Sequence, residues 1–124
     1  NPLIDLGQIE GGYIQGMGWL TSEELVYSNT GELLTHGLST YKIPTASDRP
    51  IMNINLWKGF NSRDILYRSK AVGEPPFMLA ISVHSAIAHA ISGFSKDDHY
   101  WPDLNAPATP QEVLRCIQCA INGR

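Results

Sequence analysis

One carboxylate lies in a part of the sequence that restricts its backbone. Glu74 stands between Gly73 and the pair Pro75–Pro76, within the stretch 69–77. Glycine adopts backbone angles that other residues resist, and prolines suit the first positions of a helix. Pro75 should also keep Glu74 out of the helical region. A carboxylate held in this way suits a catalytic or anion-sensitive site, but an acidic residue is also an ordinary start signal for a helix.

The cysteines and histidines do not predict a second site. Cys116 and Cys119 form a Cys-x-x-Cys pair, which can indicate redox or zinc chemistry. A zinc site needs a second ligand pair, and the two cysteines fall inside a helical pattern. His84 and His89 are five residues apart, or about 140° around a helix, so they cannot easily grip one ion. We therefore expect reduced, structural thiols and predict no metal ligands.

Apolar periodicity predicts the helices that would position Glu74. Residues 79–94 carry apolar side chains at spacings of three and four, which predicts a long helix directly after Glu74. A shorter last helix should begin at Thr109, because a capping residue is followed by Pro110 and, three residues on, by Glu112.

The first predicted helix, residues 6–25, is unusual for its glycines. Each interior glycine costs about 1 kcal/mol relative to alanine, so something must come close to the backbone. Another helix could pack along the face between Gly12 and Gly16. Alternatively, a cofactor could lie against the glycine-rich end, where Gln8 offers amide donors and an acceptor.

Strand signals fall between the helices. Residues 24–27 and 32–35 flank a Ser-Asn-Thr-Gly turn and predict a hairpin. Residues 51–58 alternate apolar and polar side chains, as a half-buried strand does, and residues 65–68 suit a short strand. The predicted fold class is α+β: long helices packed on one face of a small, mostly antiparallel sheet. Residues 1–124 would form a single domain, or part of a larger one.

Composition excludes several classes of protein. The chain has 124 residues, 43% of them hydrophobic, and a formal net charge of −3. A disordered tail, a nucleic-acid-binding protein and a protein of anionic membrane surfaces are not expected. No apolar stretch reaches the roughly 18 residues that a membrane span requires. The chain begins Asn1-Pro2 rather than with Met, which suggests a cut inside a longer polypeptide or a processed terminus. Reduced thiols favour a cytoplasmic location.

Four motifs, in order, resemble a known family. They are residues 7–18 (GQIEGGYIQGMG), 39–44 (STYKIP), 70–76 (KAVGEPP) and 106–110 (APATP). Together they are similar to the C-terminal part of the molybdopterin-binding large subunit in the bacterial xanthine dehydrogenases, within the xanthine dehydrogenase/aldehyde oxidase family of molybdenum hydroxylases. The resemblance covers essentially the whole chain. The Gly-Glu-Pro-Pro motif alone would fit aldehyde oxidases equally well.

The resemblance implies roles for particular residues. The family hydroxylates a purine carbon of hypoxanthine or xanthine with oxygen derived from water. Glu74 matches the catalytic glutamate, which accepts a proton from the attacking hydroxyl group. Gln8 matches a glutamine that contacts the pterin of the molybdenum cofactor, and Val72 and Gly73 match the backbone beside it.

The resemblance also implies partners that lie outside these 124 residues. The remainder of the molybdopterin subunit, and an iron–sulfur/FAD subunit carrying 2Fe–2S clusters, would complete the enzyme. We therefore expect the chain alone to be inactive, to bind cofactor weakly and to self-associate through exposed apolar surface. Two alternatives stay open: an aldehyde oxidase-like segment, and a non-catalytic α+β binding or assembly module.

Overall fold

The computed structural model describes residues 1–70 and 72–123, and its regular elements are helices. Their bounds are α1, Pro2–Thr21; η1, Ala46–Asp48; η2, Leu66–Arg68; α2, Pro75–Met78; α3, Ile81–Ser92; and α4, Pro110–Asn122. The two η elements are single turns of 3-10 helix.

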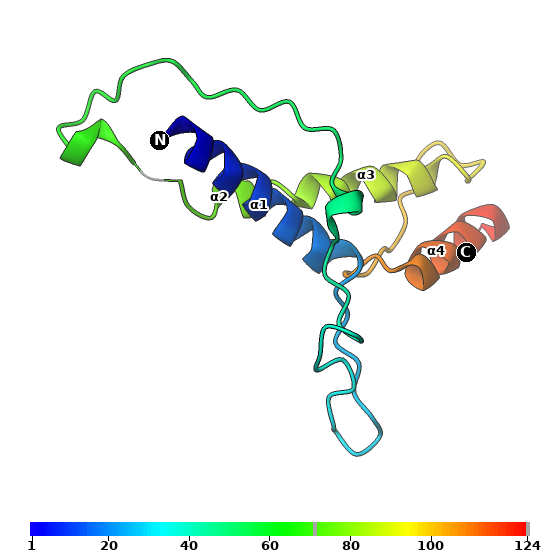
Figure 1. The fold of residues 1–124 in the computed structure, drawn as a ribbon. Coiled ribbons are helices and arrows are strands. Elements are labelled where there is room, and N and C mark those ends of the chain that lie inside the picture. Colours follow the sequence, from blue (N-terminus) through cyan, green and yellow to red (C-terminus); the bar gives the residue numbers. More distant parts are fainter. Residues whose placement is uncertain (71, 124) are drawn as a thin grey trace.

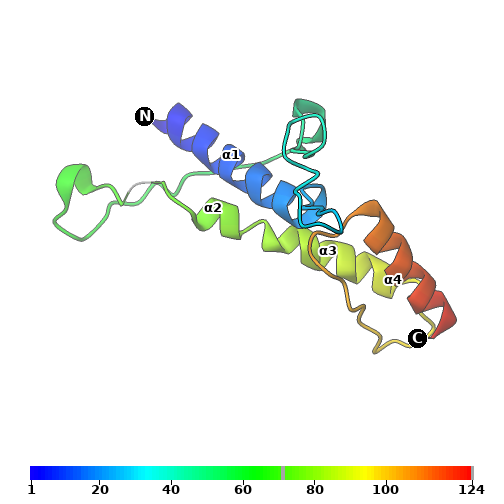
Figure 2. The same cartoon turned by 90° about the horizontal axis from the view of Figure 1, so that it is seen from below.

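The four α-helices make up the body of the molecule. Helices α2 and α3 follow one another along the side of α1, and α4 packs against α3 (Figure 2). Residues 22–45 project from the end of α1 as a narrow arm, and residues 49–70 run in a long arc past α1 before the chain reaches α2 (Figure 1). This path returns the chain from the end of α1 to a position beside its middle, where α2 packs at Gly12 and Gly16.

Helix α1 confirms the first predicted helix, with bounds shifted toward the N-terminus. The Asn1 side chain caps it by accepting a bond from the Leu3 N–H at 3.1 Å. Helix α2 packs on the face of α1 between Gly12 and Gly16. This is the helix-packing alternative of the two that the sequence left open. A Cβ placed on Gly12 would lie 3.3 Å from the Pro76 Cβ, and Gly16 is buried. A close helix contact therefore accounts for these two glycines.

The predicted α+β sheet is wrong. The hairpin reduces to one antiparallel bridge, Tyr27–Leu33, flanked by two backbone bonds of 2.8 Å in the arm. Residues 51–58 form no strand: Ile51 is 95% exposed and Trp57 93% exposed. A strand satisfies its backbone groups by pairing with a neighbour, and the described residues offer this segment none.

One further local prediction fails, and another holds only in part. The predicted short strand at 65–68 is a 3-10 turn in which Tyr67 and Arg68 have φ values of 52° and 54°. The long helix after Glu74 is divided into α2 and α3. At the division, hydrogen bonds between residues three apart, as in a 3-10 helix, replace the α-helical bonds between residues four apart. Ala80 N–H donates to the Phe77 carbonyl at 3.2 Å, and Val83 N–H donates to the Ala80 carbonyl at 2.9 Å.

The buried core lies between α3 and α4. Ile91, Cys116 and Ala120 form its centre, with exposed fractions of 2%, 1% and 2%. Partly buried apolar residues surround them: Ile87, Tyr100, Leu104, Val113 and Ile117. Helix α4 begins as predicted, because the Thr109 hydroxyl oxygen accepts a bond from the Glu112 N–H at 3.3 Å. Both cysteines lie in α4 as free thiols.

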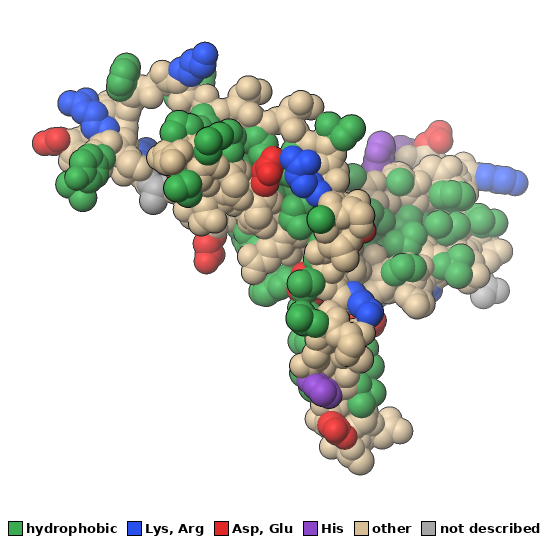
Figure 3. Space-filling model, in the orientation of Figure 1, with side chains coloured by type: hydrophobic (Ala, Val, Ile, Leu, Met, Phe, Trp, Pro, Cys, Tyr) green, Lys and Arg blue, Asp and Glu red, His purple; other side chains and the backbone are tan. Residues whose placement is uncertain are grey.

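Much apolar surface stays uncovered. Figure 3 shows hydrophobic side chains distributed over the body and along the arm. Leu3 is 79% exposed and Leu38 80% exposed. Among the helices in the described part of the chain, none combines the length and hydropathy needed to cross a bilayer.

Candidate functional site

A pocket between α1 and the start of α2 contains every residue predicted for the site. Its volume is about 600 Å³. Gln8 comes from α1, while Val72, Gly73 and Glu74 come from the segment that leads into α2. The structure thus brings together residues about 65 positions apart in the chain, as the helix pairing over Gly12–Gly16 requires. Ala71, the neighbour of Val72 in the KAVGEPP motif, lies outside the described residues.

The backbone of Glu74 differs from the prediction. Its φ of −69° and ψ of −19° are helical, so Pro75 does not exclude it from this region. The Glu74 carbonyl oxygen accepts a bond from the Met78 N–H at 3.1 Å, which stabilises the helical conformation against the proline ring. The Glu74 side chain makes no capping bond and is exposed on the pocket wall. Its carboxylate is therefore not engaged in starting α2.

The opposite wall is one face of α1. Gln8, Gly11, Gly12, Gln15 and Trp19 line the pocket at spacings that place them on the same side of a helix. A Cβ added to Gly11 would have no heavy atom within 4 Å, so this part of α1 presents bare backbone to the cavity. The two glutamine amides supply both donors and acceptors beside it.

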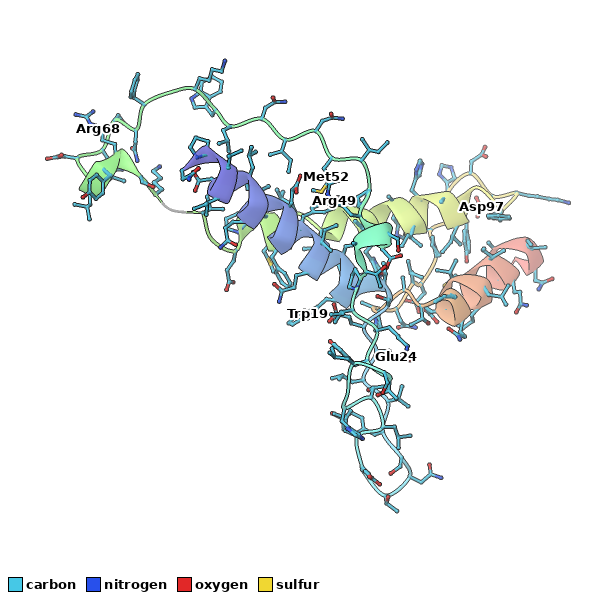
Figure 4. All side chains as sticks on the ribbon, viewed as in Figure 1. Trp19, Glu24, Arg49, Met52, Arg68 and Asp97 are labelled. Carbon is cyan, nitrogen blue, oxygen red and sulfur yellow. The ribbon has the colours of Figure 1, made fainter. Side chains whose placement is uncertain are left out.

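Two aromatic rings line one end of the pocket. The Trp19 and Phe77 ring centroids are 5.1 Å apart, with the ring planes at 84° in an edge-to-face contact. Trp19 lies on the side of α1 away from Arg49 and Met52 (Figure 4). The Arg49 guanidinium pairs with the Glu10 carboxylate at 2.8 Å and fastens the residues after η1 to α1.

Sequence reasoning missed Gln15, Trp19 and Phe77 as pocket residues. Gln15 and Trp19 follow Gln8 by seven and eleven positions, which keeps all three on one helical face. Phe77 follows Glu74 by three positions, about one turn along α2. Helical spacing from the two predicted residues would have identified all three.

The chemistry of the lining is simple. Among the described residues, Glu74 is the one charged side chain lining the pocket; the other polar groups are amides, the Trp19 indole N–H and backbone. The described residues also contain no group of three or more His, Cys, Asp or Glu side chains that could hold a metal ion. The site can thus offer a proton acceptor, amide hydrogen bonds and a close approach to backbone.

Comparisons with known sequences find similarity to a molybdopterin cofactor-binding domain and to xanthine dehydrogenases. Residues 1–50 match the family model described as a molybdopterin cofactor-binding domain. The chain is 43% identical over 128 residues to xanthine dehydrogenase of Oryza sativa subsp. japonica, covering 94% of this chain and 9% of that protein. It is 44% identical over 116 residues to xanthine dehydrogenase of Dictyostelium discoideum, covering 91% of this chain and 8% of that protein.

A solved structure shares the arrangement of elements. The chain superposes on the crystal structure of quinoline 2-oxidoreductase from Pseudomonas putida 86 with a TM-score of 0.77 and 30% sequence identity. The superposition covers 95% of this chain and 14% of that one. The chain therefore spans a small part of the proteins that it matches.

Proposed function

This chain belongs to the molybdenum hydroxylases of the xanthine dehydrogenase type, and we propose that it forms one wall of their active site and carries the catalytic base. The observation that carries this proposal is the shared pocket. The pocket has a volume of about 600 Å³, and Glu74 lines it opposite the Gln8–Gly12 face of α1.

The pocket residues fit molybdopterin. A pterin is a flat heterocycle edged with hydrogen-bond donors and acceptors, and Gln8 and Gln15 supply complementary amide groups. Gly11 leaves space that a side chain would fill. Val72 and Gly73 present backbone on the other side of the cavity. We propose that Gln8, Val72 and Gly73 hold the cofactor, with α1 supporting its flat face.

The residues of the chain divide the work around the cofactor. When bound, the molybdenum cofactor supplies the oxygen-transfer and redox chemistry. Glu74, as a carboxylate, accepts a proton at a side-chain oxygen from the water-derived hydroxyl that attacks the substrate carbon. Trp19 and Phe77 give one end of the pocket an apolar lining.

We propose a purine, hypoxanthine or xanthine, as the substrate. We prefer a purine to an aldehyde or another heterocycle because sequence identity is higher to the xanthine dehydrogenases. Identity to the xanthine dehydrogenases is 43% and 44%, against 30% for quinoline 2-oxidoreductase. The pocket lining in this chain contributes no residue that would distinguish these substrates by charge.

The proposal requires further polypeptide. The chain spans 9% of its rice relative, and it exposes large apolar side chains. We propose that the remainder of a molybdopterin subunit covers them, and that an iron–sulfur/FAD subunit in the cytoplasm accepts the electrons. Alone, the chain should self-associate and should not convert xanthine to urate. A clean monomer in sedimentation at high concentration, or urate formation by the purified chain, would contradict these statements.

The decisive experiment is Glu74→Gln in the complete enzyme. We expect kcat to fall by at least about 100-fold, the usual contribution of a general base, with molybdenum and pterin content unchanged. Glu32→Gln is the matched control, because Glu32 is exposed, does not line the pocket and loses the same charge. If Glu74→Gln retains most of the activity, Glu74 is not the base and the alternative of a non-catalytic module gains support.

A further inference from the structure

We propose that Gly16 is a positioning residue for Glu74. Gly16 lets α1 and α2 touch, and this contact fixes where the carboxylate stands in the pocket. The inference rests on the proposed role of Glu74 as the base. It adds a residue on a different helix, outside the pocket lining, that the reaction would depend on.

The contact at Gly16 leaves no room for a side chain. A Cβ placed there would overlap the carbonyl oxygen of Phe77, and it would lie 2.7 Å from the Ala80 Cβ. Ordinary carbon contacts are about 3.5–4 Å. The obstructing atoms are a backbone carbonyl and a Cβ, neither of which can rotate away. An alanine at position 16 would therefore move α2 by about 1 Å relative to α1.

Glu74 is tied rigidly to the part that would move. It directly precedes α2, and its carbonyl oxygen accepts a bond from the Met78 N–H at 3.1 Å. Leu79 N–H continues the turn by donating to the Pro75 carbonyl at 3.0 Å. The prolines fix φ within this turn. The Glu74 side chain makes no capping bond that would hold it elsewhere, so a shift of α2 reaches the carboxylate.

The same displacement leaves the α1 wall in place. Gln8 lies about two turns before Gly16 on the helix and Gly11 about one and a half, and a Cβ on Gly11 meets nothing within 4 Å. A change at Gly16 therefore alters the distance between the two walls rather than the wall that faces the cofactor. Misplacement of a reacting group by about 1 Å can cost about 100-fold in rate.

The glycines of α1 provide a graded series for the test. A Cβ on Gly7 meets no heavy atom within 4 Å. A Cβ on Gly12 would lie 3.3 Å from the Pro76 Cβ and 3.4 Å from the Phe77 nitrogen, which asks α2 to yield by a few tenths of an ångström. Gly16 requires the largest shift. Alanine at each position adds the same methyl group to the same helix.

The experiment compares Gly7→Ala, Gly12→Ala and Gly16→Ala in the complete molybdenum enzyme. We expect kcat to be unchanged for Gly7→Ala and to fall by about 10- to 100-fold for Gly16→Ala. The fall for Gly12→Ala should be intermediate. KM and molybdenum content should stay near the values of the unmodified enzyme. Hydrogen exchange of the backbone amides at residues 77–80 should be faster in Gly16→Ala and unchanged in Gly7→Ala.

Each other outcome overturns the inference. Unchanged exchange and unchanged kcat in Gly16→Ala would show that the helix contact tolerates a methyl group. Faster exchange with unchanged kcat would show that the contact does not position Glu74. A fall in molybdenum content that parallels the fall in kcat would show a role in cofactor retention instead. If Gly16→Ala does not fold, the milder Gly12→Ala variant decides, with molybdenum content showing whether its methyl group instead disturbs the pocket wall that Gly12 lines. A Glu74→Gln enzyme that stays active would refute the base itself, a result separate from all of these.

Discussion

Glu112 is the most highly bonded carboxylate in the described chain, and its removal makes a quantitative prediction. Its oxygens accept bonds from the Asn105 N–H at 2.8 Å, the Asn105 amide at 2.9 Å, and two Arg115 nitrogens at 2.7 and 2.6 Å. Arg115 also donates to the Asp103 carbonyl at 2.7 Å. The cluster fastens the loop before α4 to its first turn, so Glu112→Gln should loosen this end of the molecule.

The magnitude follows from the pKa of Glu112. The Arg115 guanidinium foremost, and then the Asn105 donors, lower this pKa from 4.5 to about 2. At 1.36 kcal/mol for each pH unit, the difference corresponds to about 3 kcal/mol. Solvent screens the pair, because the Arg115 side chain is 47% exposed while that of Glu112 is 14% exposed. We therefore expect Glu112→Gln to cost about 1–2 kcal/mol at pH 7.

The sign of the pH dependence is fixed by the direction of the shift. A lowered folded-state pKa stabilises the folded chain above pH 4.5, and this stabilisation is lost as the pH falls toward 2. The difference between the unmodified chain and Glu112→Gln should thus shrink to less than half of its neutral value at pH 3. Urea unfolding followed by far-ultraviolet circular dichroism measures it, with Glu32→Gln as the control. A difference that stays constant from pH 7 to pH 3 would refute the reasoning.

Two more predictions concern the core between α3 and α4. Ile91→Ala should cost about 2–4 kcal/mol in urea unfolding, because Ile91 is 2% exposed at the centre of that core; Ile81→Ala, at a position 56% exposed, should cost less than about 1 kcal/mol. Burial raises the pKa of the Cys116 thiol, so iodoacetamide at pH 8 should label Cys119 well before Cys116 in peptide maps. Equal labelling rates would contradict this arrangement.

Local chemistry predicted the start of α4 correctly. Thr109 caps α4 through a bond to the residue three positions on, so both partners lie within one short motif. The Glu112 carboxylate does not complete the expected capping box. It binds Asn105 instead, and the Thr109 N–H donates to the Pro107 carbonyl at 2.8 Å. The loop that supplies these partners has no periodicity from which to read its path.

The failed strand predictions, and the division of the predicted long helix, depended on distant partners. Met52 and Ile54 are partly buried while Asn53 and Asn55 are exposed, so the alternation read from the sequence is real. Alternation reports which side of a segment faces the protein, but a strand also needs a neighbour, and the described residues supply none. The break between α2 and α3 carries no proline or glycine. It coincides with Ala80, which is 0% exposed and faces Gly16 on another helix.

The site was predicted further than the fold. Motif resemblance named Gln8 and Glu74, and the structure places both on one pocket. Their roles in binding and proton transfer stay predictions. Trp19 and Phe77 line the pocket because α1 and α2 pack together, and no sequence motif predicts this packing.

The interruption at Leu79–Ala80 separates two halves of the molecule. On one side, α2 packs on α1 and presents Glu74; on the other, α4 packs mainly on α3 around Ile91. The halves meet chiefly where α3 touches α1. Substitutions around Ile91 should therefore change the free energy of unfolding without moving the Glu74 carboxylate. The effects on stability of substitutions near Ile91 and of substitutions near Glu74 should therefore be nearly additive.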